Sequence, residues 1–205
     1  MILASASPRR LELLAACGLD IEVRPADIDE QRLPDEHPRD LVRRLAEGKA
    51  QAAYDALDAP LDDVLVAADT IVWDDNGDVL GKPADAADAA HMLELLSGKT
   101  HHVSTGVCVM VPDAEGPRKA SFVETTDVSF CTLSKDEIGA YVASGEPMDK
   151  AGAYGIQGLG RMLVSGINGD YLNVVGLPVN RTLREIDRLV GGGAYVTRAL
   201  GGIHE

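Results

Sequence analysis

Residues 1–20 read MILASASPRRLELLAACGLD, and this stretch predicts how the fold begins. The apolar run at 2–4 is typical of a short strand, and the pattern from 8–17 is typical of a helix. Ser7 stands at the expected N-cap of that helix and Gly18 follows its end. The chain is therefore predicted to start as a strand, a tight turn and a helix, with serines and arginines gathered at the turn.

The remaining sequence continues to alternate between strand and helix patterns. Further strands are predicted at 21–24, 63–73, 103–111 and 120–130, and further helices at 39–57, 84–97, 134–144 and 178–190. The central pair of strands predicts an antiparallel hairpin, so the fold class is α/β with a mixed sheet. We assign one domain to 1–190 and predict a loose C-terminal tail at 191–205.

Composition excludes several classes of protein. The formal net charge of −14 over 205 residues argues against a protein that coats nucleic acid, because such binding depends on clustered lysine and arginine. No apolar run approaches the roughly 20 residues of a membrane span, so we expect a cytoplasmic protein with no membrane partner. A polyanionic ligand would need local positive charge from a few cations, a helix N-terminus or a divalent metal.

The turn SASPRR is the first candidate site. Unpaired N–H groups at a helix N-terminus, together with Ser5, Ser7, Arg9 and Arg10, would make a cradle the size of a phosphate. The sequence alone leaves open a simpler alternative, a capped helix with solvated arginines.

Asp69 is the second candidate, because it ends a run of valine and alanine that should be a buried strand. A carboxylate in that position needs partners, and a metal ion or a water molecule would serve, although a structural role in a turn stays open. Glu30 could join Asp69 on a hard cation such as Mg²⁺, with a solvated loop as the alternative. Lys82, in GKP, could reach a phosphate, whereas Lys49 is most simply a surface residue.

The glycine-rich stretch GAYGIQGLG at 152–160 lacks the setting of a dinucleotide-binding fingerprint. It is better interpreted as a turn-rich loop that lets Gln157 and backbone amides approach a ligand.

Several motifs appear together and in order along the chain. They are LASASPRRLELL (3–14), the IDE loop (28–30), LAEGKA (45–50), AADTIV (67–72), GKP (81–83), SGKTHHVSTGV (97–107) and DKAGAYGIQGLGRMLVSGINGDYLNVVGLPV (149–179). Through these motifs, taken together and in this order, the chain resembles the Maf family of nucleoside triphosphate pyrophosphatases. The resemblance covers nearly the whole chain except its C-terminal tail.

The resemblance implies a fold, a reaction and an assembly. The fold would be the α/β architecture of inosine triphosphate pyrophosphatases, with two lobes around a nucleotide cleft, in a homodimer. Water would attack the bond between the α- and β-phosphates, with Asp69 as the general base and Mg²⁺ or Mn²⁺ held by Glu30 and Asp69. The phosphate and metal site would be lined by Ser5, Ser7, Arg9, Arg10, Glu30, Lys49 and Lys82.

Three positions bear on the nucleobase. Arg9, Thr70 and Gln157 together resemble the branch of the family that prefers dTTP and UTP, whereas the branch acting on 7-methyl-GTP has SPWRR, Asp-Gln and a glutamate in the loop. The resemblance therefore implies hydrolysis of dTTP and UTP, and of modified pyrimidine nucleotides. Preference for 7-methyl-GTP or another purine nucleotide, and a non-catalytic nucleotide-binding regulator of cell division, are the alternatives.

Overall fold

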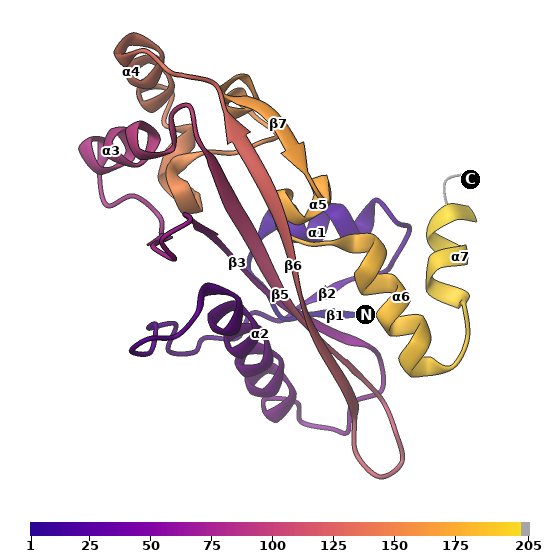
Figure 1. The fold of residues 1–205 in the computed structure, drawn as a ribbon. Helices are drawn as coiled ribbons and strands as arrows, with labels where there is room; N and C mark the ends of the chain where they lie inside the picture. Colours follow the sequence, from indigo (N-terminus) through magenta and orange to yellow (C-terminus); the bar gives the residue numbers. More distant parts are fainter. Residues whose placement is uncertain (202–205) are drawn as a thin grey trace.

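Two long antiparallel strands, β5 (Thr100–Val111) and β6 (Arg118–Phe130), run through the centre of the protein (Figure 1). The computed structural model describes residues 1–201. Within this range seven strands form one mixed sheet in the order β2-β1-β3-β5-β6-β7, with β4 paired to β3. The other strands are β1 (Ile2–Leu3), β2 (Glu22–Val23), β3 (Leu65–Trp73), β4 (Val79–Leu80) and β7 (Val164–Asn168). The prediction of a mixed α/β fold with a central hairpin is confirmed.

Helices cover both faces of this sheet and its far end (Figure 1). They are α1 (Pro8–Ala15), α2 (Pro38–Asp55), α3 (Ala86–Leu96), α4 (Lys135–Ala143), α5 (Tyr171–Val175), α6 (Val179–Val190) and α7 (Ala194–Gly201). The short 3-10 helices are η1 (Glu146–Asp149), η2 (Ala151–Ala153) and η3 (Leu159–Leu163). Among residues 1–201, none of the helices combines the length and apolar character that a membrane span requires.

The alternation of side chains along β3 decides which helix covers which face. Leu65 and Ala67 pack in one apolar cluster with α2, whereas Val66 and Ala68 pack in another with α1 and α6. Because successive side chains of a strand point to opposite faces, the next two residues, 69 and 70, must also face opposite ways. Asp69 is directed to the α2 side and Thr70 to the α1 side.

The edge of β3 is open where these two residues lie. β1 pairs with β3 in parallel at Leu65 and Val66, and β4 pairs with it antiparallel at Val72 and Trp73. Between these pairings, residues 67–71 have a described strand neighbour only on the β5 side. The chain after β1 turns into α1 at this gap, so the first turn of α1, the end of β4 and both faces of β3 converge there.

A glycine allows α2 to approach the sheet beside Asp69. Gly106 of β5 is the register partner of Asp69, and a Cβ built on Gly106 would lie 2.1 Å from the carbonyl oxygen of Val42 in α2. That distance is far inside van der Waals contact, so any side chain at Gly106 would displace the helix. The glycine therefore brings the backbone of α2, and with it Lys49, close to β3.

The C-terminal region corrects one prediction. Residues 194–201 form α7, although a loose tail was expected from 191 onward. The Asp187 carboxylate of α6 accepts the backbone N–H groups of Tyr195 and Val196, at 2.8 and 3.1 Å, and so caps the start of α7. Sequence periodicity could not reveal this cap, which comes from another helix. Residues 202–205 lie outside the described residues, and the division of the chain at 190 stays a prediction.

Candidate active site

A cavity of about 1080 Å³ lies at the open edge of β3. All ten residues proposed from the sequence line it, namely Ser5, Ser7, Arg9, Arg10, Glu30, Lys49, Asp69, Thr70, Lys82 and Gln157. They come from positions up to 152 residues apart, as the separation of Ser5 and Gln157 illustrates. The fold therefore brings together in one cavity residues that lie in separate motifs of the sequence.

The lining of the cavity differs from the rest of the chain in the sign of its charge. Six cationic side chains line the cavity, those of Arg9, Arg10, Arg32, Lys49, Lys82 and Lys150. Four carboxylates also line it, those of Glu30, Asp69, Glu146 and Asp149. Cations thus outnumber anions here, whereas the whole chain carries a formal charge of −14. This local excess meets the requirement that a polyanionic ligand imposes.

Asp69, Lys49 and Glu30 form an ion cluster. Lys49 Nζ lies 2.7 Å from Asp69 Oδ1 and 2.6 Å from Glu30 Oε1. Asp69 is only 8% exposed, so its charge would be costly without a partner, and the ammonium of Lys49 supplies one. The expectation that Lys49 is a surface residue is therefore wrong, because the side chain turns inward from α2 onto β3.

The same cluster is the place where a divalent metal could bind. Two carboxylates, those of Asp69 and Glu30, converge on one cationic group, and both provide the hard oxygen ligands that Mg²⁺ and Mn²⁺ prefer. Across residues 1–201 no group of three or more His, Cys, Asp or Glu side chains is arranged to hold a metal. The donor set therefore fits an ion that takes one or two carboxylates from the protein and its other ligands from substrate phosphates and water.

Arg10 ties the first turn of α1 to the other face of β3. Its guanidinium donates to Ser5 Oγ and to Thr70 Oγ1, both at 2.9 Å, and to the carbonyl oxygen of Gly176 at 2.8 Å. Thr70 in turn shares a hydrogen bond with Thr105 at 2.9 Å. Burial lowers the pKa of Arg10, and the Asp69 carboxylate partly offsets that effect. Arg10 thus serves the structure of the turn, and its use in phosphate binding stays a proposal.

The remaining predicted residues face the cavity more freely. Arg9 is one-third exposed and contacts Asp149 at 3.2 Å. Ser7 stands at the N-cap of α1 as predicted, but its side chain makes no capping hydrogen bond. Lys82 follows β4, and Gln157 is exposed on the loop before η3. The N-terminus of α1 therefore opens toward the cavity with Arg9 beside it.

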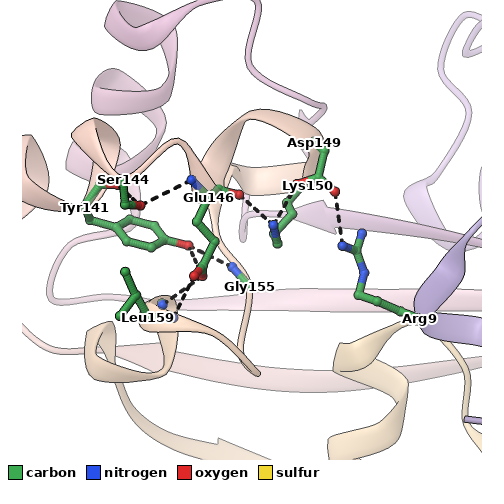
Figure 2. A network of polar contacts seen from close by, with 9 residues as sticks. Arg9, Tyr141, Ser144, Glu146, Asp149, Lys150, Gly155 and Leu159 are labelled. Carbon is green, nitrogen blue, oxygen red and sulfur yellow. Dashed lines mark hydrogen bonds and ion pairs between the residues drawn. The ribbon is translucent and has the colours of Figure 1, made fainter. Parts of the chain in front are cut away.

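Sequence reasoning missed the segment at 146–150, which Figure 2 shows in close view. Glu146, Asp149 and Lys150 line the cavity and are joined by hydrogen bonds to one another and to Arg9. Asp149 and Lys150 open the motif at 149–179, but in the sequence they are marked only as a pair of opposite charges beside a glycine-rich stretch. Such a pair is usually solvated, so it could not be told from a surface feature.

Comparison with known proteins agrees with the geometry. A sequence model described as "Maf-like protein" matches residues 1–189. The chain belongs to the Maf family. This membership confirms the resemblance drawn from the motifs. It also accounts for the order in which the motifs occur.

Several curated relatives within the Maf family share one name, "dTTP/UTP pyrophosphatase". The protein of Koribacter versatilis is 50% identical over 188 residues, covering 92% of this chain and 93% of that protein. The protein of Geobacillus sp. is 47% identical over 189 residues, covering 92% and 97%. That of Bacillus cereus strain AH820 is 46% identical over 186 residues, covering 91% and 93%. Maf relatives of similar length thus match this chain almost from end to end.

We predict that Arg10→Lys lowers the free energy of unfolding by about 2 to 4 kcal/mol, because the single ammonium of lysine cannot reproduce the forked geometry with which the buried guanidinium donates to Ser5, Thr70 and Gly176. Arg9→Lys is the matched control, since its exposed ion pair contributes less than about 1 kcal/mol. Urea denaturation followed by circular dichroism measures both. Equal unfolding midpoints for the two variants would contradict the role assigned to Arg10.

Proposed function

We propose that this protein hydrolyses dTTP and UTP to the nucleoside monophosphate and pyrophosphate. The observation that carries the proposal is the convergence of the ten predicted residues on one cavity in a chain of the Maf family. The names of the relatives, about half of whose residues are identical to this chain, support the choice of substrate. The cationic lining supports a ligand with several phosphates.

In this proposal the cations bind the triphosphate. Arg9, in the first turn of α1, and Lys82, just after β4, both line the cavity, and the N-terminus of α1 adds unpaired N–H groups and a partial positive charge. Charge on the phosphoryl oxygens is spread in the transition state, so fixed cations around it lower the barrier. Positioning of the substrate is then the main task of these residues.

Asp69 is proposed to accept a proton from the attacking water. Its carboxylate is fixed by Lys49 through Oδ1, and the side chain lines the cavity at the centre of the site. A base in a fixed orientation contributes about 10² to 10⁴ in rate. Glu30, which shares Lys49, would help to keep that ammonium in place.

A divalent cation, Mg²⁺ or Mn²⁺, is proposed to bind at Asp69 and Glu30. When bound, such an ion polarises phosphoryl oxygens and offsets their charge. We expect pyrophosphate release to cease in excess chelator and to return when Mg²⁺ or Mn²⁺ is added. Undiminished turnover in excess chelator would exclude the metal.

Gln157, with Arg9 and Thr70, is proposed to favour a pyrimidine. An amide offers one donor group and one acceptor, which complement the imide edge of thymine or uracil. A site that pairs such an edge rejects a mismatched base, because buried polar groups would be left without partners. Modified pyrimidine nucleotides such as 5-methyl-UTP keep this edge and are expected substrates.

The experiment that tests the function is a panel of nucleoside triphosphates with pyrophosphate detection. We expect dTTP and UTP to give kcat/KM values at least about tenfold above those of ATP, GTP and 7-methyl-GTP. A best rate with 7-methyl-GTP or another purine would refute the pyrimidine assignment. No pyrophosphate release with any nucleotide would favour a binding protein, such as a regulator of cell division.

We expect Asp69→Asn to remove most turnover while the protein stays folded. The amide keeps the shape of the carboxylate but loses its basicity and charge, so kcat should fall about a hundredfold or more. Steady-state kinetics with dTTP and a thermal melt measure the two effects. Retention of more than about a tenth of the wild-type kcat would rule out Asp69 as the base.

A homodimer and a cytoplasmic location are also part of the proposal. The homodimer is implied by resemblance to the Maf family, and the mass of the protein in solution tests it. The location follows from the sequence alone and stays a prediction.

A further inference from the structure

The carboxylate of Glu146 binds the backbone of the loop that carries Gln157. Figure 2 shows the Glu146 side chain lying between Tyr141 of α4 and the backbone of the loop. Glu146 Oε2 accepts the N–H of Leu159 at 2.7 Å, and Oε1 accepts the N–H of Gly160 at 3.0 Å. These bonds fix the chain immediately after Gln157.

Tyr141 binds the loop on the N-terminal side of Gln157. Its hydroxyl donates to Glu146 Oε1 at 2.9 Å and accepts the N–H of Gly155 at 3.1 Å. The hydroxyl and the carboxylate together bind the backbone before and after residues 156–158. This pair of side chains therefore holds the backbone on both sides of Gln157, and burial of Ile156 in the neighbouring apolar cluster holds the loop as well.

The glycines of the loop are explained by the same contacts. A Cβ built on Gly158 would lie 2.3 Å from Glu146 Oε2, and one on Gly160 would lie 2.7 Å from the Tyr141 hydroxyl. A larger residue at either position would force the loop or these two side chains to move. The loop is thus shaped to fit closely around Glu146 and Tyr141.

Glu146 stays ionised in this setting. Burial alone would raise its pKa, but hydrogen bonds from Gly160, Leu159 and Tyr141 outweigh burial and hold the pKa below its usual value. An ionised carboxylate is an acceptor only, which matches the three donors around it. Bonds of this charge-assisted kind are among the stronger ones in proteins.

The same segment also reaches Arg9. Lys150 Nζ donates to the carbonyl oxygen of Glu146 at 2.6 Å and to Asp149 Oδ1 at 2.7 Å, and Asp149 Oδ2 accepts from Arg9 at 3.2 Å (Figure 2). Two of the three residues proposed to select the base are therefore joined to η1. The ion pair between Asp149 and Arg9 is exposed and therefore weaker. The segment 146–150 thus acts mainly on the loop that carries Gln157.

We propose that Glu146 is a positioning residue that sets the place of Gln157 and thereby the preference for pyrimidine nucleotides. The inference rests on the proposed function, because it assumes that Gln157 reads the base. Glu146 acts through the backbone at 158–160 and does not take part in the chemistry at Asp69. Its loss should therefore affect binding and selectivity more than the chemical step.

Glu146→Gln tests this inference, because the amide turns one acceptor into a donor that faces N–H or O–H groups. A shift of about 1 Å in a positioning group can cost about a hundredfold in rate. We expect kcat/KM for dTTP and UTP to fall about tenfold to a hundredfold, mainly through KM, while the residual activity with ATP changes by less than about threefold. Tyr141→Phe removes the two hydrogen bonds of the hydroxyl, to Glu146 and Gly155, but leaves the bonds from Leu159 and Gly160 to Glu146 in place, so it should change selectivity in the same direction by a smaller factor. It also carries the test if Glu146→Gln does not fold.

Glu137→Gln is the matched control. Glu137 also accepts a backbone N–H and a hydroxyl, both from Ser134 in the capping box of α4, but it does not touch the loop. Glu137→Gln should lower the thermal midpoint to an extent similar to Glu146→Gln, and it should leave the ratio of dTTP to ATP activity unchanged. A merely structural role for Glu146 would give the same result as this control.

A double-mutant cycle with Gln157→Ala decides the route of the effect. If Glu146 acts through Gln157, the double variant should lose no more selectivity than Gln157→Ala alone, because the second change has nothing left to displace. Additive losses, or full selectivity in both Glu146→Gln and Tyr141→Phe, would overturn the inference. So would a Gln157→Ala variant that keeps its selectivity. A wild-type protein without preference for dTTP and UTP would instead overturn the proposed function, which separates the two failures.

Discussion

The ion pair between Lys49 and Asp69, 2.7 Å long, is the contact on which the arrangement of the site depends. A carboxylate in the middle of a buried strand needs a close partner, and a cationic partner must come from another element because β3 contains no lysine, arginine or histidine. Helix α2 supplies it, and Gly106 makes the approach of α2 possible. The orientation of the proposed base therefore depends on the packing of α2 against the sheet.

The interruption in strand pairing along β3 gives this pair its setting. An unbroken sheet would pair both edges of the strand, whereas the gap between β1 and β4 leaves residues 67–71 without a described strand neighbour on one edge, and Asp69 and Thr70 line the cavity there. Asp69 and Thr70 face opposite helices and still line one cavity. One half of the site is consequently held by α2 and the other by the buried guanidinium of Arg10 at the start of α1.

Local signals in the sequence predicted the elements that depend on local physics. The turn at Ser7, the helix after Ser134 and the central hairpin follow from capping residues and strand alternation. The inward turn of Lys49 and the cap from Asp187 onto α7 did not follow, because each joins residues that meet only in the folded chain. Glu146 was missed for the same reason, since its carboxylate meets the Tyr141 hydroxyl and two backbone N–H groups only in the folded chain. Asp69 could be found because a charge inside an apolar run is anomalous in any fold.

The charge of the cavity lining has a consequence for the kinetics of encounter. At long range a triphosphate meets a protein with a formal charge of −14 and is repelled, whereas inside the cavity it meets six cationic side chains against four carboxylates. At an ionic strength of about 0.1 M the outer field is screened beyond about 10 Å, while contacts inside the cavity persist. Added salt therefore screens the long-range repulsion of the triphosphate before it weakens the contacts inside the cavity. At low ionic strength the same outer field repels anionic products once they have left the cavity, so rebinding is disfavoured there.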